Sequence, residues 1–289
     1  MVKRSELNKH LTNTVLMRID YIPISNENVD EINGKIAKEL LIDGAIKFDQ
    51  MKDTFIRAID IKINDPSIQD FNEYINVKEN SKIKAYEYFK INDGEINIKV
   101  IFNRQFTTIE INQKNEYQKY ENYKTIFCKI LEILKDRGII INRFGFRKFN
   151  DIFFKEDTNI YEYINRDYFN LECDSLVNVE VENYITEKRF CFKKENLNIN
   201  LITHTSQGLL NGNEIKRVAF DMDIYVNEIQ ELKKLFDDNE KEKFLDNIND
   251  NLFLIYKNLL TAKLLEILKT TSKLDDDNII DGVEYNGEN

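Results

Sequence analysis

The sequence predicts an α+β protein of two related units, each an antiparallel β-meander closed by a long helix, packed closely together. Segments with alternating apolar residues come in runs, and each run ends in a segment with helical spacing. This order occurs twice along the 289 residues. The whole chain contains only two prolines and nine glycines, which leaves little material for a flexible linker between the units.

The expected domain boundaries follow from this repeat. The N-terminal α+β unit is expected to cover residues 1–155, and the C-terminal α+β unit residues 156–272. Residues 273–289 are acidic and contain glycine, which predicts a flexible tail that cannot bury itself.

The first unit opens with a strand and a helix. Thr14–Ile24 has the apolar pattern of a strand, and residues 25–41 follow with a Ser-Asn cap. The helix is indicated by four apolar residues at helical spacing, namely Val29, Ile32, Ile36 and Leu40. A second strand is expected at Phe55–Ile63, closed by an Asn-Asp-Pro turn.

The clearest hairpin lies in residues 82–111, where two alternating segments meet at Asp93-Gly94. Residues 116–138 follow with the pattern of an amphipathic helix. One stripe of it carries Tyr120, Tyr123, Phe127, Ile130, Leu131 and Leu134. Gly138 stands where a helix C-cap is expected, so the helix should end near Arg137. A strand is expected directly afterwards, over Ile139–Asn150.

The second unit repeats the order of strands before a helix. Strands are expected in residues 175–194, 199–205 and 215–226, separated by a turn at 195–198 and a loop at 206–214. A shorter segment at 227–236 leads to one long helix at residues 248–269. The endings FCKILEIL and AKLLEIL are similar, although sequence identity between the halves is slight.

Composition argues against broad nucleic-acid binding and against a membrane-spanning protein. A net charge of −10 disfavours broad nucleic-acid binding, since the phosphate backbone favours clustered Lys and Arg, although a local basic patch stays possible. No apolar run approaches the roughly 20 residues of a membrane span, and the N-terminus lacks a leader, so a cytoplasmic location without a membrane is expected.

The chain also offers little material for catalysis or for cofactors. It has two histidines, no glycine-rich phosphate loop, and three cysteines without zinc-ligand spacing, namely Cys128, Cys173 and Cys191. We therefore expect no cofactor, no bound metal and no catalytic residues.

The strand at Ile139–Asn150 carries the strongest candidate site. Alternation places Arg143, Gly145 and Arg147 on one face. Because Gly145 lacks a side chain, it opens a slot in which a carboxylate or phosphate could lie between two guanidinium groups. On the strand at 215–226 the same count places Asp221 and Asp223 together, opposite the core face.

Three interpretations of these charged residues stay open. The arginines can pair with Asp221 and Asp223 and clamp the two units together, they can bind an anion, or they can extend to solvent. The two aspartates could instead begin a metal site of a nuclease or phosphoesterase, but Asp-x-Asp alone is a common pattern on surface strands.

The stretch RFGFRKFNDIFF resembles the R-x-G-[LF]-R-Y-[IV]-N box of a sporadically distributed family of uncharacterised prokaryotic proteins. The matching positions are Arg143, Gly145, Phe146, Arg147 and Asn150. The family's later D-[IM]-D strand resembles Asp221-Met222-Asp223, and its closing helix resembles the segment Asn251–Thr271. The likeness extends to about Thr271.

Three positions depart from the usual family pattern. Lys148 stands where an aromatic residue is usual, Phe146 replaces the commoner leucine, and Tyr256 stands where a histidine is often found. The resemblance implies a common fold and a mobile-element or phage-defence setting, and it implies no activity. The order of strands before a helix is also similar to that of the export chaperone that holds unfolded chains on an antiparallel sheet.

These observations predict an interaction or regulatory protein that is not an enzyme and that binds another macromolecule. A protein partner is expected, and a homo-oligomer is possible. The alternatives are a metal-dependent nuclease or phosphoesterase and a holdase of unfolded chains that resembles the export chaperone.

Overall fold

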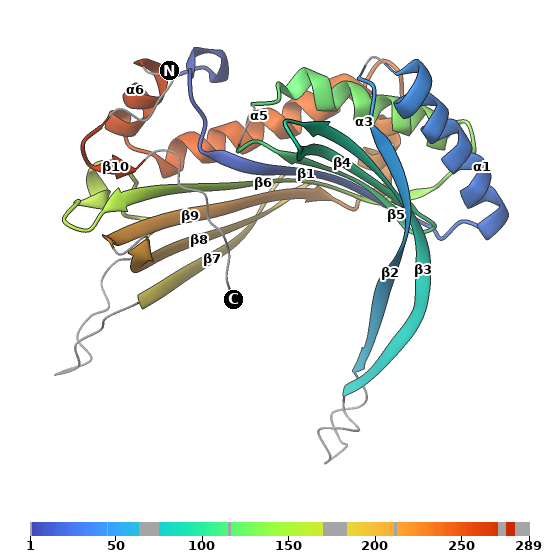
Figure 1. Ribbon diagram of the computed structural model, residues 1–289, viewed down its shortest axis with the longest axis horizontal. Helices are drawn as coiled ribbons and strands as arrows, with labels where there is room; N and C mark the ends of the chain where they lie inside the picture. Colours follow the sequence, from blue (N-terminus) through green and yellow to red (C-terminus); the bar gives the residue numbers. More distant parts are fainter. Residues whose placement is uncertain are drawn as a thin grey trace. The chain divides into compact units, whose positions relative to one another are not determined.

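The computed structural model describes residues 2–44, 46–63, 75–114, 117–169, 184–210, 213–270 and 276–280. Over these residues the protein has a mixed α+β fold with a large antiparallel sheet (Figure 1). The predicted α+β class is therefore confirmed. No helix within the described ranges has the length and apolar character that crossing a membrane requires.

The chain divides into two compact units. Unit 1 comprises Met1–Met17, Ile111–Gln118 and Arg143–Asn289, and unit 2 comprises Arg18–Glu110 and Lys119–Asn142. The units are thus interleaved along the chain, whereas the sequence suggested a single boundary after residue 155. Whether the two units are related meanders stays a prediction.

Unit 2 contains four neighbouring strands in the order β2-β3-β4-β5. Their bounds are β2 (Gln50–Ile63), β3 (Ile75–Asn92), β4 (Glu95–Asn103) and β5 (Phe106–Asn112). The helices of this unit are α1 (Asn26–Ala37), which continues as a π-helical turn (Lys38–Asp43), and α3 (Tyr120–Lys135). Strand β1 (Thr12–Tyr21) contributes residues to both units.

Positive φ angles explain two sequence signals in unit 2. Asp93 (φ 49°) and Gly94 (φ 84°) connect β3 to β4, as expected for a type I′ hairpin turn. Gly138, three residues beyond the end of α3 at Lys135, has φ 62°, and its lack of a Cβ lets the chain leave the helix. The predicted hairpin and the predicted end of the helix are both confirmed.

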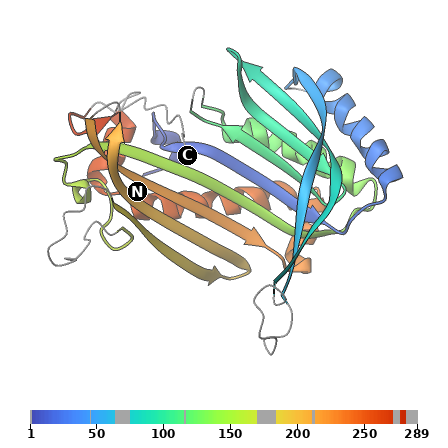
Figure 2. The same cartoon turned by 60° about the horizontal axis from the view of Figure 1, so that its bottom comes forward.

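In unit 1 the strands β6, β9, β8 and β7 are neighbours in that order (Figure 2). Their bounds are β6 (Ile141–Lys155), β7 (Tyr184–Lys194), β8 (Leu197–Leu210) and β9 (Asn213–Val226). The helices are α4 (Ile229–Leu232), α5 (Lys241–Leu259) and α6 (Ala262–Thr270), and three short 3-10 turns lie at Arg4–Glu6, Ile160–Glu162 and Lys233–Phe236. The first part of the strand expected at 175–194 lies outside the described residues.

The expected single helix at 248–269 is instead two helices. α5 begins at Lys241, and the chain becomes extended at Leu260, which bridges to Ile164. Thr261 then accepts a hydrogen bond from the backbone of Leu264 through its hydroxyl group (3.4 Å), so it serves as an N-cap for α6. The break depends on Ile164, a partner far away in the sequence, so helical periodicity alone did not reveal it.

The core of unit 1 lies between α5 and one face of the sheet. On β9 the core face carries Val218, Phe220, Met222 and Ile224, as alternation predicted, and also Val226. Ile215, Ala219 and Asp221 of the same strand are buried as well. Aromatic pairs join the two layers: Phe144 contacts Phe244 with ring centroids 6.0 Å apart, and Phe220 contacts Tyr256 at 5.8 Å. Since α5 covers this face, the odd-numbered residues of β6 and β9 lie on the opposite one.

Part of the expected flexible tail is ordered. Ile279–Ile280 forms the short strand β10, which pairs with Phe154 and Phe153 of β6. Ile279 is buried, and this gives the segment an apolar anchor that its acidic composition obscured. Residues 279–280 are thus paired with β6, the rest of 273–289 outside 276–280 lies beyond the described residues, and the mobility of the tail stays a prediction.

Candidate functional site

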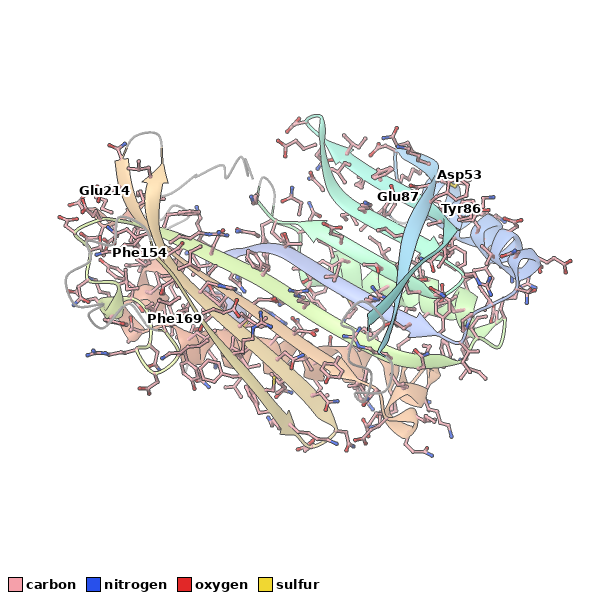
Figure 3. The ribbon with its side chains drawn as sticks, turned by 90° about the horizontal axis from the view of Figure 1, so that it is seen from below. Asp53, Tyr86, Glu87, Phe154, Phe169 and Glu214 are labelled. Atoms are coloured by element: carbon pink, nitrogen blue, oxygen red, sulfur yellow. The ribbon has the colours of Figure 1, made fainter. Side chains whose placement is uncertain are left out.

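The candidate site is the face of β6, β9, β8 and β7 that points away from α5, which we call the open face. Figure 3 shows this side of the strands with the helices behind them. Arg147 is paired with Asp223 in the β6-β9 ladder, Gly145 with Tyr225, and Phe149 with Asp221. This register places the candidate side chains predicted from the sequence on the same face of unit 1.

Arg147 and Asp221 form a two-point ion pair across the β6-β9 ladder. Arg147 Nε donates to Asp221 Oδ1 at 2.7 Å, and Arg147 Nη2 donates to Asp221 Oδ2. The hydrogen bond to Asp221 raises the pKa of Arg147 and outweighs the opposing effect of burial. The Asp221 side chain is only 7% exposed, whereas that of Arg147 is 49% exposed.

Arg143 occupies the space above Gly145. Its guanidinium carbon lies 5.1 Å from the centre of the Tyr225 ring, and its Nη2 lies 3.8 Å from Asp223 Oδ2. A Cβ added at Gly145 would lie 3.3 Å from Arg143 Nη2. The slot that the sequence suggested for an anion is therefore filled by the guanidinium of Arg143 itself.

Asp223 lies in a mixed environment. Burial raises its pKa, while the positive charges of Arg143 and Arg147 act in the opposite direction and do not fully compensate. A hydrogen bond to the side chain of Asn200 also favours the charged form. Asp223 is therefore shared between two arginines, and the two ion pairs form one connected group.

Two further arginine pairs lie on the open face, and sequence reasoning missed both. Arg217 Nη2 lies 3.1 Å from Asp151 Oδ2, and its guanidinium lies over the Phe153 ring at 5.8 Å. Arg189 of β7 pairs with Glu187 on the same strand. Alternation along each strand gives the signal for these residues, but the pairing of Arg217 with Asp151 depends on the register between β6 and β9.

The same burial pattern recurs in all four pairs: the arginine is more exposed than its carboxylate. For Arg217 and Asp151 the side-chain exposures are 26% and 9%. The pairs of Arg143 with Asp223 and of Arg189 with Glu187 follow the same rule. In each pair the carboxylate is thus the less exposed partner, and Arg147 and Arg189 are the most exposed of the four arginines.

The positions of the four predicted charged residues bear on the clamp between units and on the metal site that the sequence suggested. Arg143, Arg147, Asp221 and Asp223 all lie in unit 1, so their ion pairs join adjacent strands of one unit. Within the described ranges, no cluster of three or more His, Cys, Asp or Glu side chains has the arrangement of a metal site. Both oxygens of Asp221 already accept hydrogen bonds from Arg147.

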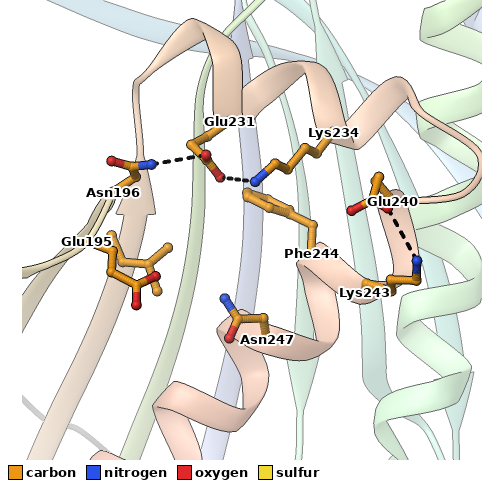
Figure 4. A pocket seen from close by; sticks show the side chains of 9 residues that line it. Glu195, Asn196, Glu231, Lys234, Glu240, Lys243, Phe244 and Asn247 are labelled. Atoms are coloured by element: carbon orange, nitrogen blue, oxygen red, sulfur yellow. Dashed lines mark hydrogen bonds and ion pairs between the residues drawn. The ribbon is translucent and has the colours of Figure 1, made fainter.

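A polar pocket of about 230 Å³ lies between the β7-β8 turn, the α4 region and the start of α5 (Figure 4). Its lining residues are Glu195, Asn196, Leu197, Glu231, Lys234, Glu240, Lys243, Phe244 and Asn247. Lys234 donates to Glu231 at 2.8 Å, which lowers the pKa of that carboxylate, and Asn196 also donates to it. Sequence patterns did not indicate this pocket, because three separate segments of the chain form it.

No protein-family model matches the chain, and no curated protein is significantly similar to it in sequence. The resemblance of the box around Gly145 to a prokaryotic family therefore stays a prediction.

Proposed function

We propose that this protein is an interaction protein whose open face binds an acidic surface of a partner protein. The observation that carries the proposal is the burial order of the four ion pairs, in which each arginine is more exposed than its carboxylate. The arginines are Arg143, Arg147, Arg189 and Arg217, and Arg147 and Arg189 are the most exposed of them. Arginine is enriched in protein interfaces and binds carboxylates through two parallel hydrogen bonds.

The carboxylates underneath give the arginines a fixed geometry. Asp221 holds Arg147 through two bonds, and Asp151 holds Arg217 through one. A side chain that is already ordered loses less entropy when a partner binds, which favours affinity. The partner's carboxylates would meet the solvent-facing edges of guanidinium groups whose positions are set in advance.

The same arrangement favours a protein over a nucleic acid as the partner. The chain has a net charge of −10, and each of the four arginines already has a carboxylate beside it. Such local pairing reduces the long-range electrostatic attraction on which binding to the phosphate backbone of a nucleic acid depends. Small groups of carboxylates are recognised at short range, where hydrogen-bond geometry matters more than net charge.

A metal-dependent nuclease is less well supported. Metal coordination by Asp221 would have to replace both of its hydrogen bonds to Arg147. The setting we propose is a mobile-element or phage-defence system, and it rests on the resemblance of the box at Arg143–Asn150.

The test is cross-linking mass spectrometry on the protein isolated from its native host at low salt, followed by binding measurements with the identified partner. The double variant Arg143→Ala/Arg189→Ala is suitable, since Asp223 and Glu187 keep some contact with water and the fold should survive. Arg104→Ala is the matched control, because Arg104 is exposed and belongs to unit 2.

We expect cross-links between the open face and an acidic segment of the partner. Affinity should fall at least about tenfold in the double variant and stay unchanged in Arg104→Ala. A partner that binds the double variant as tightly as the original protein would overturn the proposal. A bound nucleic acid, or self-association through another surface with no other partner, would also overturn it.

A further inference from the structure

A second group of charged residues lies on the opposite face of β6, beneath α5. The ammonium group of Lys148 donates to Asn249 Oδ1 of α5 at 2.7 Å and lies 5.4 Å from the Phe146 ring centre. Among the residues that the structure describes, no carboxylate forms an ion pair with it. Lys148 is half-buried, and an ammonium group that is partly removed from water without a counter-charge is costly, so its surroundings are informative.

The neighbouring charges add to this positive excess. Burial and the positive charge of Arg4 lower the pKa of Lys148 to about 7. Burial, Lys148 and Arg4 likewise lower the pKa of His10 to about 4. Asp250 is the acidic neighbour, but it lies 3.8 Å from Arg4 and its side chain is 73% exposed. Basic groups therefore predominate around Lys148.

Asn249 adds a donor that has no acceptor. The residue is fully buried, and because its Oδ1 accepts from Lys148, its amide nitrogen is the atom left over. Within the described part of the chain, this Nδ2 has no hydrogen-bond partner. A buried donor without an acceptor is rare in native proteins and is often explained by a bound water or ion.

We propose that Lys148, Asn249 and Arg4 form a binding site for a small inorganic anion. Lys148 and Arg4 supply positive charge, and the Asn249 amide supplies a neutral donor. An anion at this position would accept the unused hydrogen bonds of Lys148 and Asn249 and neutralise the excess charge. The site lies on the α5 side of β6, so it is separate from the open face and does not depend on the proposed partner.

The test uses sodium chloride as the probe, with sodium gluconate replacing it to keep the ionic strength constant. Thermal unfolding of the full chain is followed as chloride rises from zero, and chloride NMR line widths report binding directly. Two variants remove the site in opposite ways: Lys148→Met deletes the charge, and Asn249→Asp places a carboxylate beside Lys148. Lys233→Met is the control, since Lys233 is exposed.

We expect the melting temperature of the unmodified protein to rise with chloride by about 3 °C or more and then saturate. Lys233→Met should respond in the same way. Asn249→Asp should melt at a higher temperature than the unmodified protein without chloride, and neither site variant should respond to chloride. Absence of a saturating response in the unmodified protein, or an equal response in either site variant, would overturn the proposal.

Discussion

Removing Arg147 and removing Asp221 should have different effects on stability, because the partner that remains is buried in one case and exposed in the other. Replacing Arg147 by Ala leaves a carboxylate that is only 7% exposed without its two donors, which we expect to cost about 3 kcal/mol or more of unfolding free energy. Replacing Asp221 by Asn leaves a guanidinium that is already 49% exposed and can bond to water, so we expect a loss of about 1 kcal/mol.

Urea denaturation of both single variants measures this asymmetry. The double variant, with both changes, should recover part of the loss caused by Arg147→Ala, since it no longer contains the unpaired charge. Equal losses in the two single variants would contradict the burial order on which the open face depends.

Lys148 predicts a specific dependence of stability on pH. Its pKa is about 7 in the folded protein, against 10.5 for an ordinary lysine. Between these values the unfolded chain binds a proton that the folded chain does not, so the unfolding free energy should rise with pH from about 7 to about 10. Below pH 7 both states are protonated and the full penalty of the buried charge remains.

Lys148→Met should therefore be more stable than the unmodified protein at pH 7 and should lose this slope. Urea titrations between pH 6 and pH 9, in gluconate without chloride, test the prediction. Lys233→Met should keep the slope of the unmodified protein, because Lys233 is exposed. A slope that persists in Lys148→Met would show that another group causes it.

The strand face on which each site residue lies was predictable, because it depends only on the alternation of side chains along a strand. Counting along each strand was enough to place Arg143 and Arg147 together on one face of β6. The same count placed Asp221 and Asp223 together on one face of β9. The register that connects the two strands is a long-range property, so the filled space above Gly145 could not be predicted.

At the scale of elements, the β3-β4 turn and the β7-β8 turn make opposite predictions. The β7-β8 turn contains Glu195 at φ 53°, a conformation in which a residue with a Cβ is strained. Glu195→Gly should therefore stabilise the protein by about 0.5–1 kcal/mol, because Glu195 is exposed and little else is lost. The β3-β4 turn already has Gly94 at φ 84°, so Gly94→Ala should destabilise it by a similar amount.

Melting temperatures of the two variants, compared with that of the unmodified protein, test this prediction. The expected shifts have opposite signs, which separates a local effect of the turn from a general effect of glycine. If Glu195→Gly lowered the melting temperature, the carboxylate of Glu195 would have to make a stabilising contribution at the rim of the polar pocket.

Elements were predicted well where their signals are local. The Asp-Gly turn and the helix end at Gly138 depend on residues adjacent in the sequence, and both were found as expected. The break at Leu260 and the strand at Ile279–Ile280 depend on contacts with residues far along the chain. Such contacts override local propensity, so sequence patterns alone did not reveal them.

For the whole molecule, the interleaving of the units bears on how the chain can be divided. A cut after residue 155, at the boundary that the sequence suggested, would separate β6 from β9. These strands pair along the whole of Phe144–Lys155, and both belong to unit 1. The cut would also remove Met1–Met17 and Ile111–Gln118 from the rest of unit 1. Unit 1 would then be incomplete in both fragments.

We therefore expect fragment 156–289 to lack a cooperative unfolding transition when expressed alone. β9 would expose the apolar face that carries Phe220 and Met222, and it would lose its β6 partner. Mixing it with fragment 1–155 should restore a cooperative transition, because the missing strand is then supplied in trans. Circular dichroism during heating, on each fragment and on the mixture, makes the comparison. A sharp transition for fragment 156–289 alone would mean that β6 is dispensable and that residue 155 is a true domain boundary.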